Sequence, residues 1–201
     1  MNYKKLAKKT WHFIWEEDSL LSWVVNVILA FILIKFIVYP LLGFLLGTTH
    51  PVVAVVSTSM EHDGSFDDWW ASQANCGYPC TQGEYYSNYG ITKEEFREFS
   101  FKNGFNKGDI MVLYNPKNSE MGDIVVFWSG RANPIIHRVV KEENGTYQTK
   151  GDHNVQSIQT SYLDEYSVTP DKFVGKAVAK VPLLGYVKII FVELLRMVGI
   201  A

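Results

Sequence analysis

Residues 134–154 have the sequence PIIHRVVKEENGTYQTKGDHN, and their pattern decides the fold class. The apolar, β-branched run IIHRVV is typical of a strand, and TYQTKGD has the composition of a return strand. The turn between them, at residues 143–145, contains Asn-Gly, the dipeptide that favours a tight hairpin. We therefore expect an antiparallel β-hairpin with His137 in the middle of its first strand.

Further segments with strand-like patterns lie on both sides of this hairpin. KGDIMVLY from Lys107 and MGDIVVFW from Met121 each place a Gly-Asp turn before a β-branched run. KFVGKAVAKV, which ends at Val181, predicts another strand with a bulge at Gly175. Together with PVVAVV from Pro51, these segments predict an antiparallel sheet or barrel. The predicted fold class is mainly β, with a β-rich domain at residues 48–181.

An inserted segment is expected at about residues 61–105, between the first strand and the others. Within it, Thr92 and Glu95 form a capping-box pattern ahead of a short amphipathic helix. Cys76 and Cys80 lie four residues apart in CGYPC. A disulfide across this turn is plausible in an oxidising compartment, and two unpaired thiols are the alternative. The pair makes a poor zinc site because no matched histidine pair accompanies it.

The N-terminal part of the chain contains a long apolar run at residues 20–47. About 20 helical residues are enough to cross a hydrocarbon core of roughly 30 Å. The run is longer than the apolar region of about 7–15 residues in a cleavable signal peptide, and no small-residue cleavage site follows it. We therefore predict a transmembrane anchor helix. Lys35 interrupts it, either as a side chain that extends to the interface or as a polar contact to a partner.

The lysines near this run predict its orientation. Lys4, Lys5, Lys8 and Lys9 precede it, whereas the first basic residue after it is Lys93. Under the positive-inside rule, residues 1–19 are cytoplasmic and the β-rich domain is extracytoplasmic. The apolar C-terminal segment, residues 182–201, contains three charged residues. They favour an interfacial or membrane-associated position, or packing of LLGYVKIIF against the core, over a second span.

The overall charge argues against a nucleic-acid partner. The net charge of the chain is −2, and no basic stripe matches a phosphate backbone.

Ser59, at the end of the PVVAVVSTS segment, is the candidate nucleophile. A serine hydroxyl is weakly nucleophilic and needs a base within about 3 Å. The predicted strand would hold His137 rigidly. Asp152 and His153 lie at the end of the strand that pairs with the His137 strand. A Ser59–His137 pair with a carboxylate orienting the imidazole is therefore one interpretation. On spacing alone, a structural histidine and a simple Gly-Asp turn remain the alternative.

Three histidines are less well placed, on the cytoplasmic side or too near Ser59 in the chain: His12, His50 and His62.

Four motifs in this order behind one N-terminal anchor carry a family resemblance: VVSTSMEHDG, GDIVVFW, IIHRVV and TKGDHN. The chain resembles the type I signal peptidases, in particular their archaeal and endoplasmic-reticulum branch. The bacterial branch carries a lysine base on the strand that corresponds to IIHRVV. His137 stands at that place here, as in the Ser–His branch. The resemblance implies a β-rich domain that rests on the membrane, with strands folded over a peptide-binding groove.

The resemblance also implies roles for single residues. Ser59 corresponds to the nucleophile and His137 to the general base. Asp152 corresponds to the first carboxylate of the Gly-Asp-x-Asn motif, which orients the histidine. Ser57 corresponds to an oxyanion-stabilising residue, with a strand-end hydroxyl in local turn bonds as the alternative, and Met60 packs beside the site. Many members of the branch carry a second aspartate six residues later, where this chain has Ile158.

The function implied by the resemblance is that of a membrane-bound serine endopeptidase. It removes signal peptides from secreted and membrane preproteins by cutting after small residues. The implied partners are signal peptides, membrane lipid and a nearby Sec translocon, no cofactor or metal is expected, and the implied location is the cell membrane. A gap of 12 residues between Gly47 and Ser59 limits their separation to about 40 Å, which suits a membrane-held substrate.

Two alternatives remain. The chain could be a tethered serine peptidase for one dedicated substrate, or an anchored β-domain that binds extended peptides without cutting them.

Overall fold

The computed structural model describes residues 3–115 and 119–197. By its internal contacts the chain divides into two compact units, Met1–Leu45 and Leu46–Ala201.

The N-terminal unit is helical. Helix α1 (Tyr3–Trp15) precedes α2 (Leu20–Leu33), which continues through the π-helical turn η1 (Ile34–Val38) into α3 (Tyr39–Leu46). Among the described residues, Leu20–Leu46 is the one helix that is long and apolar enough to cross a membrane, at 27 residues. This finding agrees with the predicted span.

A proline explains the π-helical turn within this long helix. Pro40 has no N–H and would clash with a carbonyl one turn earlier, so the helix must widen locally. The N–H of Tyr39 accordingly bonds to the carbonyl of Ile34, five residues back. Lys35 lies in the same turn, with its Nζ 5.7 Å and 5.5 Å from the ring centroids of Phe31 and Phe36.

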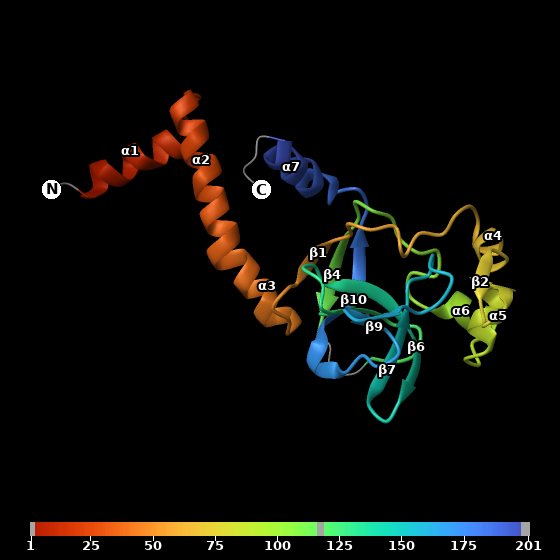
Figure 1. Cartoon of the computed structure of the whole chain (residues 1–201). Helices are drawn as coiled ribbons and strands as arrows, with labels where there is room; N and C mark the ends of the chain where they lie inside the picture. The colour runs from red at the N-terminus through yellow and green to blue at the C-terminus, as the bar shows by residue number, and fades with distance from the viewer. Residues whose placement is uncertain (1–2, 116–118, 198–201) are drawn as a thin grey trace. The chain divides into compact units, whose positions relative to one another are not determined.

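The second unit is built on a six-stranded antiparallel sheet, which confirms the predicted mainly β fold (Figure 1). The strand order is β1-β4-β10-β5-β6-β7. The strands have these bounds, in that order: Val52–Ala54, Ile110–Tyr114, Phe173–Val181, Ile124–Phe127, Ile135–Glu143 and Thr146–Lys150. Two small hairpins add β2 (Gln73–Asn75) with β3 (Pro79–Thr81), and β8 (Gln159–Thr160) with β9 (Leu163–Asp164).

The predicted hairpin is formed by β6 and β7. Asn144 and Gly145 both have positive φ angles, 52° and 73°, as the tight Asn-Gly turn requires. The pairing is not regular along its length, because the register shifts between Val139 and Lys141. β10 also has the predicted irregularity at Gly175, where its register against β5 shifts.

The core lies on both faces of the sheet. All four residues of β5 are buried, and they alternate between two apolar clusters as the two-residue period of a strand requires. One cluster also contains Val55, Met60, Phe105, Met111, Leu113, Val174 and Ala177. The other also contains Val139, Tyr147, Leu163, Val168 and Phe173. The strand that carries His137 is thus held between two packed layers.

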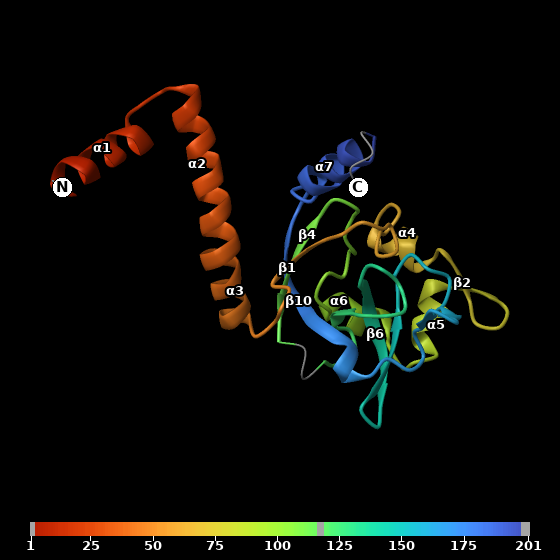
Figure 2. The ribbon, with the colours of Figure 1, turned by 60° about the vertical axis from the view of Figure 1, so that its left-hand side comes forward.

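The inserted segment contains three short helices, α4 (Phe66–Trp70), α5 (Gln82–Ser87) and α6 (Lys93–Glu98), which gather beside the β6–β7 hairpin (Figures 1 and 2). Each begins with a capping box, and that of α6 is the predicted Thr92–Glu95 pair. Cys76 and Cys80 form a disulfide. An aromatic cluster from these helices packs against Val140 of β6: Phe66, Trp69, Trp70, Tyr86, Phe96 and Phe99.

A 3-10 turn, η2 (Pro170–Lys172), leads into β10, and the last described element is α7 (Tyr186–Met197). The 12 residues of α7 extend about 18 Å, which is shorter than the roughly 30 Å of a hydrocarbon core. Large apolar side chains along and just before it are exposed: Leu183, Leu184, Val187, Ile190, Phe191, Leu194 and Met197. The position of the C-terminal segment at the membrane stays a prediction, and its residues 198–201 lie outside the described part of the chain.

Candidate active site

The structure brings the predicted nucleophile and base together. His137 is on β6 and is buried, while Ser59 lies five residues beyond the end of β1. The Oγ of Ser59 is 2.9 Å from the Nε2 of His137. The backbone holds this geometry, since the N–H of His153 donates to the carbonyl of Ser59 at 2.9 Å.

The other ring nitrogen of His137 contacts a carboxylate that the sequence did not indicate, Glu165. A short hydrogen bond joins Nδ1 to Oε1. Glu165 is fully buried, and it also accepts from Thr149 Oγ1 at 3.0 Å and from the backbone N–H of Ile158 at 2.8 Å. A carboxylate held at three points fixes both the orientation and the tautomer of the imidazole.

Asp152, which we expected beside His137, lies elsewhere, and this expectation is corrected. Its carboxylate accepts two bonds from the Arg138 guanidinium, at 2.9 Å and 2.7 Å, and one from Tyr86 at 2.8 Å. It also lies 3.0 Å from the Nε2 of His62. The absence of an aspartate at Ile158 therefore does not leave His137 without a carboxylate, because Glu165 supplies one.

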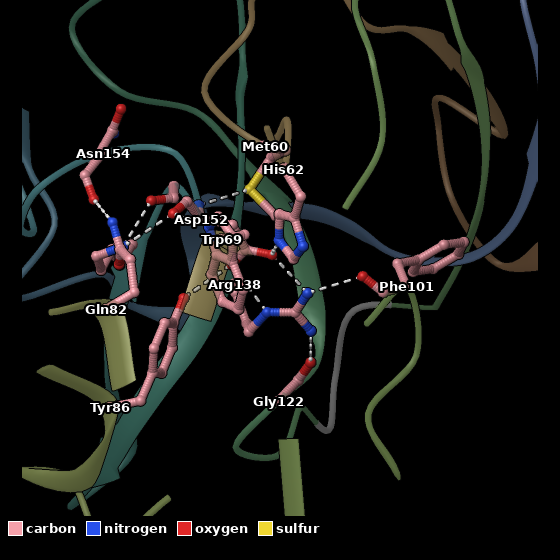
Figure 3. A network of polar contacts seen from close by, with 12 residues as sticks. Met60, His62, Trp69, Gln82, Tyr86, Phe101, Gly122, Arg138, Asp152 and Asn154 are labelled. Atoms are coloured by element: carbon pink, nitrogen blue, oxygen red, sulfur yellow. Dashed lines mark hydrogen bonds and ion pairs between the residues drawn. The ribbon is translucent and has the colours of Figure 1, made fainter. Parts of the chain in front are cut away.

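Arg138 is fully satisfied in this buried network, which Figure 3 shows. Besides the two bonds to Asp152, its guanidinium donates to the carbonyls of Ser100, Phe101 and Gly122 at 2.9–3.1 Å. These bonds use all five N–H donors of the side chain. The ion pair thus ties the end of the β6–β7 hairpin to the inserted segment.

The electrostatics of the network follow from its burial and its charges. Burial alone would raise the pKa of Asp152, but Arg138 and the bond from His62 keep that pKa well below its usual range. Burial, with the Asp152 charge, raises the pKa of Tyr86 well above its usual value. Burial also lowers the pKa of Lys150 to about 7. Lys150 Nζ donates to Gln82 Oε1 at 2.8 Å and to the carbonyl of Gly151 at 3.0 Å.

Gly151 lets the strand end pass close to the Ser59–His137 pair. A Cβ at this position would lie 2.7 Å from the carbonyl oxygen of Ser59 and 2.8 Å from Nε2 of His137. Both distances are shorter than real Cβ contacts, so a side chain here would displace the pair. The Gly-Asp sequence therefore has two separate roles, since its glycine faces the pair and its aspartate faces Arg138.

The other predicted site residues occupy different surroundings. Ser57 is exposed, and its Oγ is 3.1 Å from the Oγ of Ser59. Met60 is buried in the core, where its sulfur accepts from the backbone N–H of Asp152 at 3.4 Å. His153 turns away from His137, with its ring 3.6 Å from Asp63.

Ser57, Ser59 and His137 line one cleft of about 350 Å³, and Met60 is not among its lining residues. The remaining walls are largely apolar and include Ala54, Val56, Ile136, Ile158 and Leu163. Within residues 3–115 and 119–197, no cluster of three or more His, Cys, Asp or Glu side chains is arranged to hold a metal ion.

Sequence reasoning missed Glu165, His62 and Tyr86. Glu165 lies in LDEYSV, where nothing distinguishes it from the exposed Asp164 beside it. His62 is only three residues from Ser59 in the chain, yet it turns toward Asp152, and its ring stacks on that of Trp69 with centroids 3.7 Å apart.

The fold and the site together define a class. A hydroxyl that contacts an imidazole, backed by a buried carboxylate and facing a cleft, is the arrangement of serine hydrolases. Here it occurs on a β-rich domain that follows a helix long and apolar enough to cross a membrane.

Comparison with curated proteins points to a particular family. The chain is 34% identical over 102 residues to the signal peptidase complex catalytic subunit SEC11 of Candida tropicalis, covering 47% of this chain and 61% of that protein. It is 36% identical over 102 residues to the SEC11 subunit of Scheffersomyces stipitis, with the same coverage, and 34% identical over 103 residues to that of Colletotrichum graminicola. The resemblance to this branch of the type I signal peptidases is confirmed over about half of the chain.

The chain spans about three-fifths of the length of these curated relatives. No protein-family model matches it, and no solved structure does.

Proposed function

We propose that the chain is a membrane-anchored serine endopeptidase that removes signal peptides from preproteins. The observation that carries the proposal is the line of contacts from Ser59 Oγ through His137 to the buried Glu165, at the wall of an apolar cleft. The relatives, named as catalytic subunits of the signal peptidase complex, support the choice of substrate.

In the proposed reaction, His137 Nε2 removes the proton of Ser59 Oγ as that oxygen attacks the scissile carbonyl. The imidazolium then returns the proton to the leaving amine, which leaves an acyl-serine for water to hydrolyse with the same base. Glu165 keeps the second proton of the ring on Nδ1 and balances the transient positive charge. Asp152, with both oxygens engaged by other groups, has no part in these transfers.

The carbonyl oxygen becomes negatively charged in the tetrahedral intermediate and needs donors. We assign this role to the Ser57 hydroxyl and the backbone N–H of Ser59. The 3.1 Å contact between the two hydroxyls supports the assignment, because it places both at the same end of the cleft. Removing a donor of this kind costs roughly 10²–10³ in rate.

The cleft supports cutting after small residues. Its walls near Ser59 are formed by short or branched apolar side chains, among them Ala54, Val56 and Ile136.

The proposed topology places residues 1–19 in the cytoplasm and the β-rich unit outside, in the cell membrane or in an equivalent secretory membrane. Its supports are the lysines before Leu20 and the one candidate span found within the described residues.

The test is cleavage of a preprotein by the full chain in detergent, with the cut site located by mass spectrometry. We expect Ser59→Ala and His137→Ala each to abolish cutting while the protein stays folded, because nucleophile and base act as a unit. Ser161→Ala, at an exposed serine outside the cleft, is the matched control and should cut normally.

A preprotein with leucine before the cut site should resist cleavage, whereas one with alanine should be cut. Substantial activity in Ser59→Ala would contradict the serine mechanism, and equal rates on the two preproteins would favour a dedicated peptidase.

A further inference from the structure

Helix α1, before the long apolar helix, has two chemically distinct faces. At 3.6 residues per turn its polar face consists of Lys4, Lys5, Lys8, Lys9 and His12. The opposite face consists of Tyr3, Leu6, Ala7, Thr10, Phe13 and Ile14. None of the helix is buried, and Tyr3 and Leu6 are 73% and 53% exposed. The described part of the chain therefore leaves the apolar face largely uncovered.

Two side chains of α2 fix α1 in place. Ser22 Oγ donates to the carbonyl of Phe13 at 2.6 Å, and Asn26 Nδ2 donates to that of Ile14 at 2.8 Å. These bonds satisfy carbonyls at the end of α1, which otherwise have no partner within the helix. Both ribbon views show α1 leaving α2 at a steep angle (Figures 1 and 2). Because α2 is the first part of the candidate span Leu20–Leu46, a helix at this angle would run along a membrane surface and not through it.

We propose that α1 is a docking helix for anionic lipid headgroups. Four ammonium groups lie on one face of 13 residues that include no acidic side chain. A basic cluster of this size next to a membrane span attracts acidic lipids, at about a fivefold gain in binding per lysine. Trp11 lies at the edge of the basic face and Trp15 lies within it, between Lys4 and Lys8, with ring centroids 5.7 Å apart. Tryptophan favours the headgroup level of a membrane.

The apolar face of α1 also suits a position in the membrane interface. A helix that lies in the interface buries its apolar side about 5–10 Å deep, below the phosphates. Leu6 and Phe13, on the apolar face next to Lys9, are placed to enter that layer. The proposal goes beyond cleavage, since it concerns the other unit of the chain and does not depend on Ser59.

The test uses the full chain with a fluorophore on Leu6→Cys. The new thiol is the only reactive one, because Cys76 and Cys80 are the only natural cysteines and they form a disulfide. The protein is placed in nanodiscs of phosphatidylcholine alone, or with a third of that lipid replaced by phosphatidylglycerol. Acrylamide, an uncharged quencher, then measures exposure. We expect at least about threefold less quenching with phosphatidylglycerol, and loss of this protection at about 1 M salt.

A variant with Lys4, Lys5, Lys8 and Lys9 changed to Gln should show no such protection. The matched control changes four exposed lysines of the other unit to Gln, Lys102, Lys141, Lys172 and Lys180, and should keep it. Equal quenching in the two lipid mixtures, protection that survives high salt, or protection lost in the control would each overturn the proposal. Even if the fourfold variant does not fold, the salt dependence of quenching in the labelled protein tests the proposal.

Discussion

His137 and Arg138 are consecutive residues of β6, and each contacts one buried carboxylate. His137 contacts Glu165 on the side of the cleft, and Arg138 contacts Asp152 on the side of the inserted segment. Successive side chains of a strand point to opposite faces, so β6 keeps these two acidic groups apart. The first carboxylate faces a group that we propose exchanges protons. The second is locked in an ion pair whose donors and acceptors are all engaged.

This difference separates two properties that the Gly-Asp-x-Asn motif, taken from sequence alone, assigns to one aspartate. Chemistry at Ser59 depends on a carboxylate beside the imidazole, whereas the position of the strand end depends on the Arg138–Asp152 pair. A change at Glu165 alone should therefore lower turnover, whereas a change at Asp152 alone should lower stability.

The largest expected effect is that of Glu165→Gln on turnover. Glutamine keeps the shape but presents an amide to Nδ1, which favours the wrong tautomer of His137. The equivalent change in a known triad costs about 10⁴ in turnover, and we expect a loss of at least about 10² in kcat here. KM should change little, because Glu165 is buried behind the ring and does not line the cleft.

The control is Asp164→Asn, at the exposed carboxylate next to it. A Glu165→Gln enzyme with normal kcat would show that the contact with His137 is structural, and a changed pH profile would support the positioning role.

Asp152→Asn should show the opposite pattern, a large loss of stability. It leaves Arg138 charged and fully buried without its partner, a situation that costs about 3–5 kcal/mol. Thermal unfolding in detergent measures this loss, with Asp164→Asn again as the control. The double variant Asp152→Asn with Arg138→Met should recover part of the stability, since it removes the unpaired charge. A stable Asp152→Asn protein with a large loss of turnover would reverse the roles assigned to the two carboxylates.

The misplacement of Asp152 has a physical cause in the hairpin. The Asn-Gly turn and the strand pattern were predictable, and near the turn Glu143 pairs with Thr146. If that register continued, His137 would pair with Asp152 on the same face. An extra residue, Val140, shifts the register between Val139 and Lys141, so that Arg138 pairs with Lys150. A one-residue shift turns every later side chain to the other face, and the bulge that causes it has no signal in the sequence.

Glu165 could not be predicted for a different reason. It is the centre of hydrogen bonds from Thr149, Ile158 and His137, which meet only after β7 and the β8–β9 segment have packed. By contrast, Ser59 and His137 could be selected from sequence, because Ser59 follows a strand end, His137 lies in a strand and the family motifs mark both.

Gly151→Ala tests how closely the two regions approach each other. The added methyl would lie 2.7 Å from the Ser59 carbonyl oxygen and 2.8 Å from His137 Nε2, so backbone or ring must move. We expect roughly a tenfold or greater loss of kcat/KM, because small misplacements of reacting groups reduce the rate strongly. Gly145→Ala, in the hairpin turn, is the comparison. A Cβ there meets nothing within 4 Å, but the positive φ of Gly145 strains an alanine, so this variant should lose stability and keep its turnover. Normal turnover in Gly151→Ala would mean that the strand end moves to make room for the methyl group without displacing Ser59 or His137.

The smallest expected effect is a pH dependence of stability that arises from Lys150. Burial lowers its pKa to about 7 in the folded protein, against 10.5 for an ordinary lysine. Between these values the unfolded chain binds a proton that the folded protein does not, so stability should rise with pH, by at most about 1.4 kcal/mol per unit. Above about pH 10 the raised pKa of Tyr86 has the opposite effect, because the unfolded tyrosine then loses its proton first.

Thermal unfolding is therefore followed from about pH 7 to 9.5. Lys150→Met should flatten the rise, whereas the exposed control Lys172→Met should keep it. An equal slope in the two variants would assign the rise to other groups.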